Sequence, residues 1–144
     1  MMNAIQVHKI QFDLSPIKEI ISESKNAKQF ILDLEQGKKR SAKELTYSIR
    51  VIAQNHKKIS RQFEKNRQQI QKLSPAAAKR ITKQLGRLDD MISNLPGTKS
   101  RKLVMCIGLH FMVFDYSDLE EDYGKFGKEM RIYLELIKNA SKQA

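Results

Sequence analysis

The strongest constraint on the fold is an apolar run of twelve residues, 103–114, with the sequence LVMCIGLHFMVF. His110 is its one polar member, so neighbouring elements must cover the run and keep it from water. It is too short to cross a bilayer, which takes roughly 20 apolar residues. We therefore expect a buried helix over residues 100–117, the most enclosed element of the fold. A buried strand is the alternative, because periodicity does not separate helix from strand in a run this apolar.

Helical patterning dominates the rest of the chain. Apolar residues recur at spacings of three and four, which places them on one face of a helix. This pattern predicts helices over residues 15–36, 41–73, 74–95 and 126–140. In the longest of these the steps alternate between four and three, which is the 3.5-residue repeat of helical bundles and coiled coils. His56 and Asn66 are the two polar residues in that repeat.

Local signals mark where the helices begin and end. Ser15 and Ser74 each precede a proline, which is typical of a capping hydroxyl followed by proline in the first turn. Ser41 and Glu44 have the spacing of a capping box. Gly37 suits a helix end, where a left-handed backbone conformation is common.

An acidic stretch, residues 115–122, separates the apolar run from the last helical pattern. We interpret it as a solvated loop, with Gly124 and Gly127 loosening the chain after it. The alternative is that it pairs with basic residues of this chain or of a second copy. The carboxylates concerned are Asp115, Asp118, Glu120, Glu121 and Asp122.

Residues 1–14 are predicted to form an extended N-terminal arm, because Ile10, Phe12 and Leu14 alternate with polar residues. Residues 15–144 then form one helical domain, a size typical of a single core. Short connections favour antiparallel neighbours, so the predicted fold is an all-α, antiparallel up-and-down bundle of four to five helices. Cys106 is the single cysteine and no signal-peptide pattern opens the sequence, which favours a cytoplasmic protein.

The distribution of charge is the most informative functional feature. The net charge is +11, and residues 38–102 hold 18 Lys/Arg against four Asp/Glu. The rest of the chain holds nine basic and twelve acidic residues. Such a concentration of positive charge in the middle of the chain predicts an anionic partner.

The cations that lie off the apolar repeat are the predicted site. They would form one positive face that contacts phosphates and releases their counterions. We therefore predict a non-catalytic protein that binds RNA or DNA and needs no cofactor. The alternatives are an anionic membrane surface, or an adaptor that binds an acidic protein partner or assembles with its own copies as a homo-oligomer. The predicted contacts are Lys43, Arg50, Lys57, Lys58, Arg61, Lys65, Lys79, Arg80, Lys83 and Arg87.

Arg50 and His56 stand at the spacing R-x5-H within the longest predicted helix. This resembles the R-x4-6-H signature of the HEPN ribonucleases, which are also all-helical. In that family the arginine and histidine of two subunits meet at a dimer interface and cut RNA, so the resemblance implies RNA cleavage by these two residues. It covers these two residues alone, and Val51 stands where the family usually has a polar residue.

Other motifs predict no further site. No two histidines lie three or four residues apart and there is no cysteine pair, so we expect no metal centre. Residues 97–100 (GTKS) resemble the end of a phosphate-binding P-loop without its first glycine. Residues 124–127 have the GxxG form of a KH loop, but we assign Phe126 to the last helix. His110 is expected to be a neutral core histidine.

Overall fold

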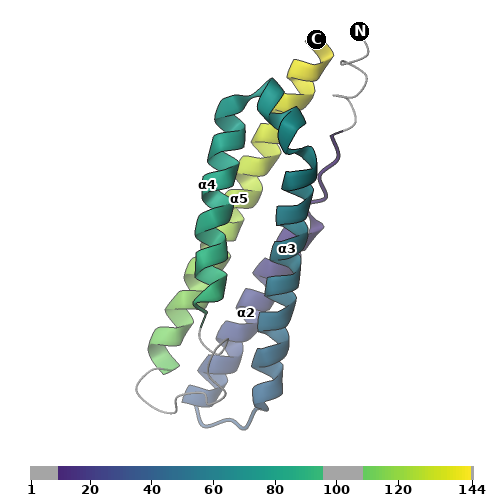
Figure 1. Ribbon diagram of the computed structural model, residues 1–144. Helices are drawn as coiled ribbons and strands as arrows, with labels where there is room; N and C mark the ends of the chain where they lie inside the picture. Colours follow the sequence, from purple (N-terminus) through teal and green to yellow (C-terminus); the bar gives the residue numbers. More distant parts are fainter. Residues whose placement is uncertain (1–9, 96–108, 144) are drawn as a thin grey trace.

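The computed structural model describes residues 10–95 and 109–143, which form four helices (Figure 1). The prediction of an all-α chain is confirmed, and the described residues include no strand. At 1.5 Å per residue, the helix of residues 42–73 is about 48 Å long and the helix of residues 109–143 is about 52 Å long. The helices are α2 (Ser15–Glu35), α3 (Ala42–Leu73), α4 (Pro75–Ser93) and α5 (Leu109–Gln143).

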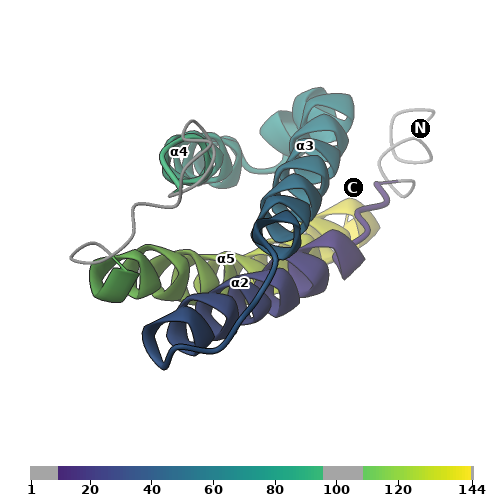
Figure 2. The ribbon, with the colours of Figure 1, turned by 90° about the horizontal axis from the view of Figure 1, so that it is seen from below.

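The four helices lie in two layers. The end-on view places α3 and α4 on one side and α2 and α5 on the other (Figure 2). Within the layers, α2 packs along α5 and α3 packs along α4. Between them, α2 contacts α3 and α4 contacts α5. We refer to these pairs as the α3–α4 layer and the α2–α5 layer.

One apolar core fills the space between the layers, and all four helices contribute to it. The predicted 3.5-residue repeat is the buried face of α3. Burying a large aliphatic or aromatic side chain contributes roughly 1.5–3 kcal/mol, so this shared core holds the layers together. Its fully buried members include Ile20, Phe30, Ile31, Ile52, Ile59, Ile70, Ile81, Tyr116, Leu119, Tyr123 and Met130.

The predicted starts of α3 and α4 are confirmed. Ser41 and Glu44 form a reciprocal capping box at the start of α3. At the start of α4, the Ser74 hydroxyl accepts a hydrogen bond from the Ala77 N–H at 3.2 Å. Gly37 follows the end of α2 with a φ of 77°, which a residue with a side chain rarely adopts.

The start of α2 differs from the prediction. Ser15 already lies in the helix, and the N-cap residue is Leu14. The carboxylate of Asp13 accepts hydrogen bonds from the Ser15 N–H and hydroxyl, both at 2.9 Å. The Asp13 carboxylate therefore satisfies the Ser15 N–H at the start of α2, two residues before the serine that the serine–proline pattern indicates as the cap.

Residues 10–14 lie against α3. Ile10, Phe12 and Leu14 are half-buried and pack on the core. The Asn66 side-chain amide donates to the Gln11 carbonyl at 3.2 Å. The polar residue Asn66 thus has a structural role in the apolar repeat, because its side chain binds the backbone of residues 10–14.

The prediction of a loop over residues 115–122 is wrong, and so is the separate last helix. Both belong to α5, which is continuous through the acidic stretch. Tyr116, Leu119, Tyr123 and Phe126 are buried at spacings of three and four, so one apolar stripe runs through the stretch and the carboxylates occupy the other positions. Each glycine in the helix costs only about 1 kcal/mol, which the stripe outweighs.

The glycines of α5 lie inside this helix, so the GxxG pattern is not a loop. A Cβ added to Gly127 would lie 3.2 Å from Cγ2 of Ile17. The absent side chain therefore lets α2 and α5 approach closely at this point.

Residues 103–114 were expected to form the most enclosed element. This expectation is wrong for Val113 and Phe114, the two residues of the run whose burial the structure describes. Phe114 is 55% exposed and Val113 is half-buried. Residues 96–108, which include Cys106 and the GTKS pattern, lie outside the described residues, as does His8. Within the described ranges, no helix combines the length and the apolar character that crossing a membrane requires.

Candidate nucleic-acid interface

The two layers differ sharply in charge. Helices α3 and α4 together contain twelve Lys/Arg and four Asp/Glu. Helices α2 and α5 contain eight Lys/Arg and eleven Asp/Glu. The positive charge of the protein is therefore concentrated on the α3–α4 layer.

All ten cations of the predicted site are exposed. At 100° per residue, the six on α3 fall within an arc of about 100° on the side opposite its buried face. They extend over about 33 Å of helix from Lys43 to Lys65. On α4, Lys79 and Lys83 lie on the side toward α3, whereas Arg80 and Arg87 lie further toward α5. We call these ten residues the basic face.

A groove between α3 and α4 gathers further positive charge. Its volume is about 520 Å³, and its lining includes Arg67, Lys79 and Lys83 beside the neutral polar Gln71 and Thr82. Pro75 and Ala78 complete that lining, which contains no carboxylate among the described residues. Arg67 forms an ion pair with Glu64 at 3.1 Å outside this lining. An anionic group that entered the groove would therefore meet several cations at once.

Sequence reasoning missed Arg67. It lies close to the buried face of α3, on the side toward α4, rather than on the outer arc. The signal that could have found it is the one-residue turn at Ser74, which sets α4 beside the last turns of α3. Residues at similar distances from such a turn lie near each other, so Arg67, seven residues before Ser74, lines the groove together with Thr82, eight residues after it.

One member of the basic face is paired within the described part of the chain. Arg87 forms an ion pair with Asp122 of α5 at 3.2 Å. Another carboxylate of the acidic stretch, Glu120, forms an ion pair with Lys28 of α2 at 2.7 Å. Asp122 and Glu120 thus form ion pairs within the chain and do not belong to a solvated loop. Of these two ion pairs, the one with Arg87 involves the basic face.

The structure does not bring Arg50 and His56 together. Arg50 is exposed, whereas His56 is 4% exposed and lies about 120° away around α3. His56 instead connects three helices, because its Nε2 lies 3.3 Å from Oδ1 of Asp89 in α4 and its Nδ1 contacts the Tyr123 hydroxyl in α5. Both ring nitrogens are therefore already engaged.

Burial fixes the protonation of this cluster. It raises the pKa of the Tyr123 hydroxyl, so the phenol keeps its proton and donates it to Nδ1. Burial also lowers the pKa of His56, which outweighs the opposite effect of Asp89. The neutral imidazole then donates from Nε2 to the Asp89 carboxylate. This arrangement suits a structural link and leaves no free lone pair for a general base.

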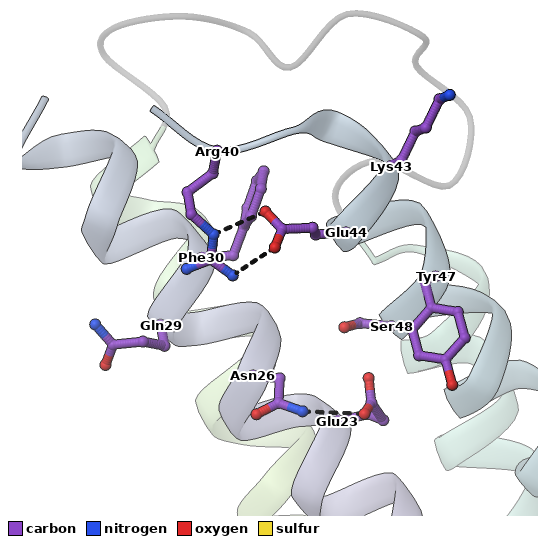
Figure 3. A pocket seen from close by; sticks show the side chains of 9 residues that line it. All are labelled: Glu23, Asn26, Gln29, Phe30, Arg40, Lys43, Glu44, Tyr47 and Ser48. Carbon is purple, nitrogen blue, oxygen red and sulfur yellow. Dashed lines mark hydrogen bonds and ion pairs between the residues drawn. The ribbon is translucent and has the colours of Figure 1, made fainter. Parts of the chain in front are cut away.

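A second groove, of about 430 Å³, lies between α2 and α3 beside the connection that joins them (Figure 3). Arg40 closes one end, since its guanidinium lies over the Phe30 ring at 5.3 Å and its Nε lies 2.7 Å from Oε2 of Glu44. This hydrogen bond lowers the pKa of Glu44, so the pair stays ionised. The lining residues are Glu23, Asn26, Gln29, Phe30, Arg40, Lys43, Glu44, Tyr47 and Ser48.

The remaining features add no metal site. In the part of the chain that the structure describes, no three His, Cys, Asp or Glu side chains cluster so that they could hold a metal ion.

The α2–α3 groove was not predicted, because its residues come from two helices and a connection. Tyr47, on the outer side of α3, was its one visible signal.

The chain matches no protein-family model, no curated protein and no solved structure.

Proposed function

We propose that the protein is a non-catalytic nucleic-acid-binding protein of the cytoplasm, and that its basic face contacts the phosphate backbone. The observation that supports this most strongly is the exposure of all ten cations on one layer, beside a cation-lined groove without a carboxylate. The proposal includes the antiparallel up-and-down bundle, because antiparallel α3 and α4 present both sets of cations on one surface.

Phosphate contact is the mechanism that fits such a surface. Each lysine or arginine that neutralises a phosphate releases condensed counterions, which drives binding without reading sequence. The outer arc of α3 would follow the backbone over about 33 Å. Arg67, Lys79 and Lys83 would hold one phosphate group in the α3–α4 groove, where several donors converge.

A salt titration tests the proposal. Binding of single-stranded RNA, single-stranded DNA and duplex DNA is measured between about 50 and 200 mM salt. The logarithm of the affinity should fall linearly with the logarithm of salt concentration, with a slope near −0.9 per phosphate contact for duplex DNA. Binding that is absent, or that does not change with salt, refutes the proposal.

A second candidate function is assembly with an acidic protein partner or with copies of this chain. It is favoured by Ile132 and Leu136, which are 59% exposed and lie one turn apart on α5. Exposed apolar residues beside the carboxylates of the α2–α5 layer suit contact with a basic face of another copy. Sedimentation equilibrium tests the self-assembly form, which a strict monomer at high protein concentration excludes.

A further inference from the structure

We propose that the α2–α3 groove holds one unpaired nucleobase, stacked on Tyr47, and that the preferred ligand is therefore single-stranded. This inference rests on the proposed function and deepens it, because it assigns a base-binding site beside the phosphate-binding face. The bases of a duplex are paired and stacked within it, whereas those of a single strand can turn outward into such a groove.

Tyr47 has the position that stacking requires. Tyr47 is 60% exposed at the edge of the groove, so a base can approach its ring from solvent (Figure 3). Lys43 lies four residues before it and Arg50 three residues after it, so both are its neighbours on the helix surface. A base on Tyr47 would therefore have its flanking phosphates beside two exposed cations.

The polar groups of the groove suit a base rather than a phosphate. Glu23 would repel a phosphate, but a carboxylate accepts hydrogen bonds from the amino and ring N–H groups of bases. The Asn26 amide donates to Oε1 of Glu23 at 3.0 Å, which holds the carboxylate and leaves its second oxygen to accept. Ser48 offers a hydroxyl on the opposite wall.

The two grooves beside α3 thus differ in chemistry. The lining of the α3–α4 groove has cations and no carboxylate, which favours phosphate. The α2–α3 groove has the carboxylates of Glu23 and Glu44, of which Glu44 is neutralised by Arg40. The arc of cations on α3 lies between them, so one strand can place its backbone on α3 and a base in the α2–α3 groove.

The geometry of the groove is set before a ligand arrives. Arg40 is held by Glu44 and by Asp33, and its guanidinium is stacked over Phe30. A volume of about 430 Å³ lies within the range of roughly 300–1,000 Å³ that is usual for small-molecule sites. A single base and part of its sugar therefore fit between the Arg40 wall and Glu23.

Replacing the stacking ring tests the inference. The affinities of the unmodified protein, Tyr47→Ala and Tyr47→Phe are measured for a single-stranded RNA and for the duplex of the same sequence. Tyr47→Ala should weaken single-strand binding about 5- to 150-fold, the usual effect of losing one base–aromatic stack. Tyr47→Phe should keep the affinity, and duplex binding should not change. Phe114→Ala, which removes another exposed aromatic ring, on α5, is the control.

Two outcomes overturn the inference: single-strand affinity that Tyr47→Ala leaves unchanged, or an equal loss for single strand and duplex. Glu23→Gln gives a second measurement, since the unmodified protein should prefer a strand that contains adenine over one that contains unsubstituted purine, which has no amino group, and the variant should lose that preference. Failure of the proposed function is distinct, because the unmodified protein would then show no salt-dependent binding. Steep salt dependence that persists in Tyr47→Ala with full single-strand affinity rejects only the base site.

Discussion

The α3–α4 layer and the α2–α5 layer bury similar apolar stripes but present different charges to solvent. In the α2–α5 layer, carboxylates outnumber cations and some form ion pairs, such as Lys125 with Glu121 at 3.3 Å. In the α3–α4 layer, Lys57, Arg61 and Lys65 follow one another at four-residue spacing. Like charges at this spacing destabilise a helix by roughly 0.2–0.5 kcal/mol per pair. The row of like charges does not stabilise the helix, which supports the proposal that it binds an anionic partner.

The largest expected effect comes from removing equal charge from each layer. The triple variant Lys57→Gln, Arg61→Gln, Lys65→Gln should weaken nucleic-acid binding by two to three orders of magnitude at about 0.1 M salt, as three lost phosphate contacts require. The matched control, Lys18→Gln, Lys25→Gln, Lys128→Gln, removes three exposed cations from the α2–α5 layer. Fluorescence anisotropy measures both. Equal losses in the two triples would abolish the functional distinction between the layers.

Among the effects on stability, the largest is expected from disrupting the cluster of His56, Asp89 and Tyr123, which joins the two layers. His56→Ala removes a buried ring, leaves the Tyr123 hydroxyl without its acceptor, and should lower the free energy of unfolding by about 2–4 kcal/mol. Urea denaturation measures this change. Asp89→Asn, at the exposed end of the same cluster, is the milder companion and should cost less than about 1 kcal/mol. If His56→Ala changes stability no more than Asp89→Asn, the cluster does not join the layers.

The same cluster predicts a dependence of stability on pH. Burial holds the pKa of His56 below its usual value in the folded protein, despite the nearby Asp89. An unfolded histidine titrates near pH 6.5. Just below that pH, His56 is protonated in the unfolded chain but stays neutral in the folded protein. Stability should therefore fall as pH drops from about 7 to 5. Thermal unfolding across this range measures the slope, and His56→Gln should flatten it; an unchanged slope in that variant would assign the effect to other groups.

The smallest effects concern glycines. A Cβ at Gly86 in α4 or at Gly124 in α5 meets no atom within 4 Å, so alanine at either position should stabilise its helix by about 0.5–1 kcal/mol. Gly127→Ala should lose most of that gain, because its Cβ would lie 3.2 Å from Ile17. Chemical denaturation of the three variants gives the comparison. A full gain at Gly127 would show that α2 and α5 are not tightly apposed there.

Local signals made the starts of α3 and α4 predictable. Ser41 with Glu44, and Ser74 with Pro75, satisfy the free N–H groups of a helix start within a few residues, so the sequence alone contains that information. The buried face of α3 was predictable for a similar reason, since its apolar repeat has no interruption other than His56 and Asn66.

The continuity of α5 was not predicted, because acidic residues on the outside of a helix resemble those of a loop. The distinguishing signal is the spacing of Tyr116, Leu119 and Tyr123, which continues through the carboxylates. The outer cations of α3 followed from periodicity within one helix. The grooves did not, because Arg67 and Lys79 line one groove, and Glu23 and Tyr47 line the other, only after separate helices pack.

The unbroken course of α5 restricts how the length of this chain can change. One residue inserted after Leu119 would rotate everything beyond it by about 100°, which would turn Tyr123, Phe126 and Met130 away from the core. α5 is continuous from Leu109 to Gln143, so it contains no loop that could absorb such an insertion. The connection at residues 36–39 can, since its residues are exposed and hold no apolar register. Tags, labels and inserted domains therefore belong in that connection and not in α5.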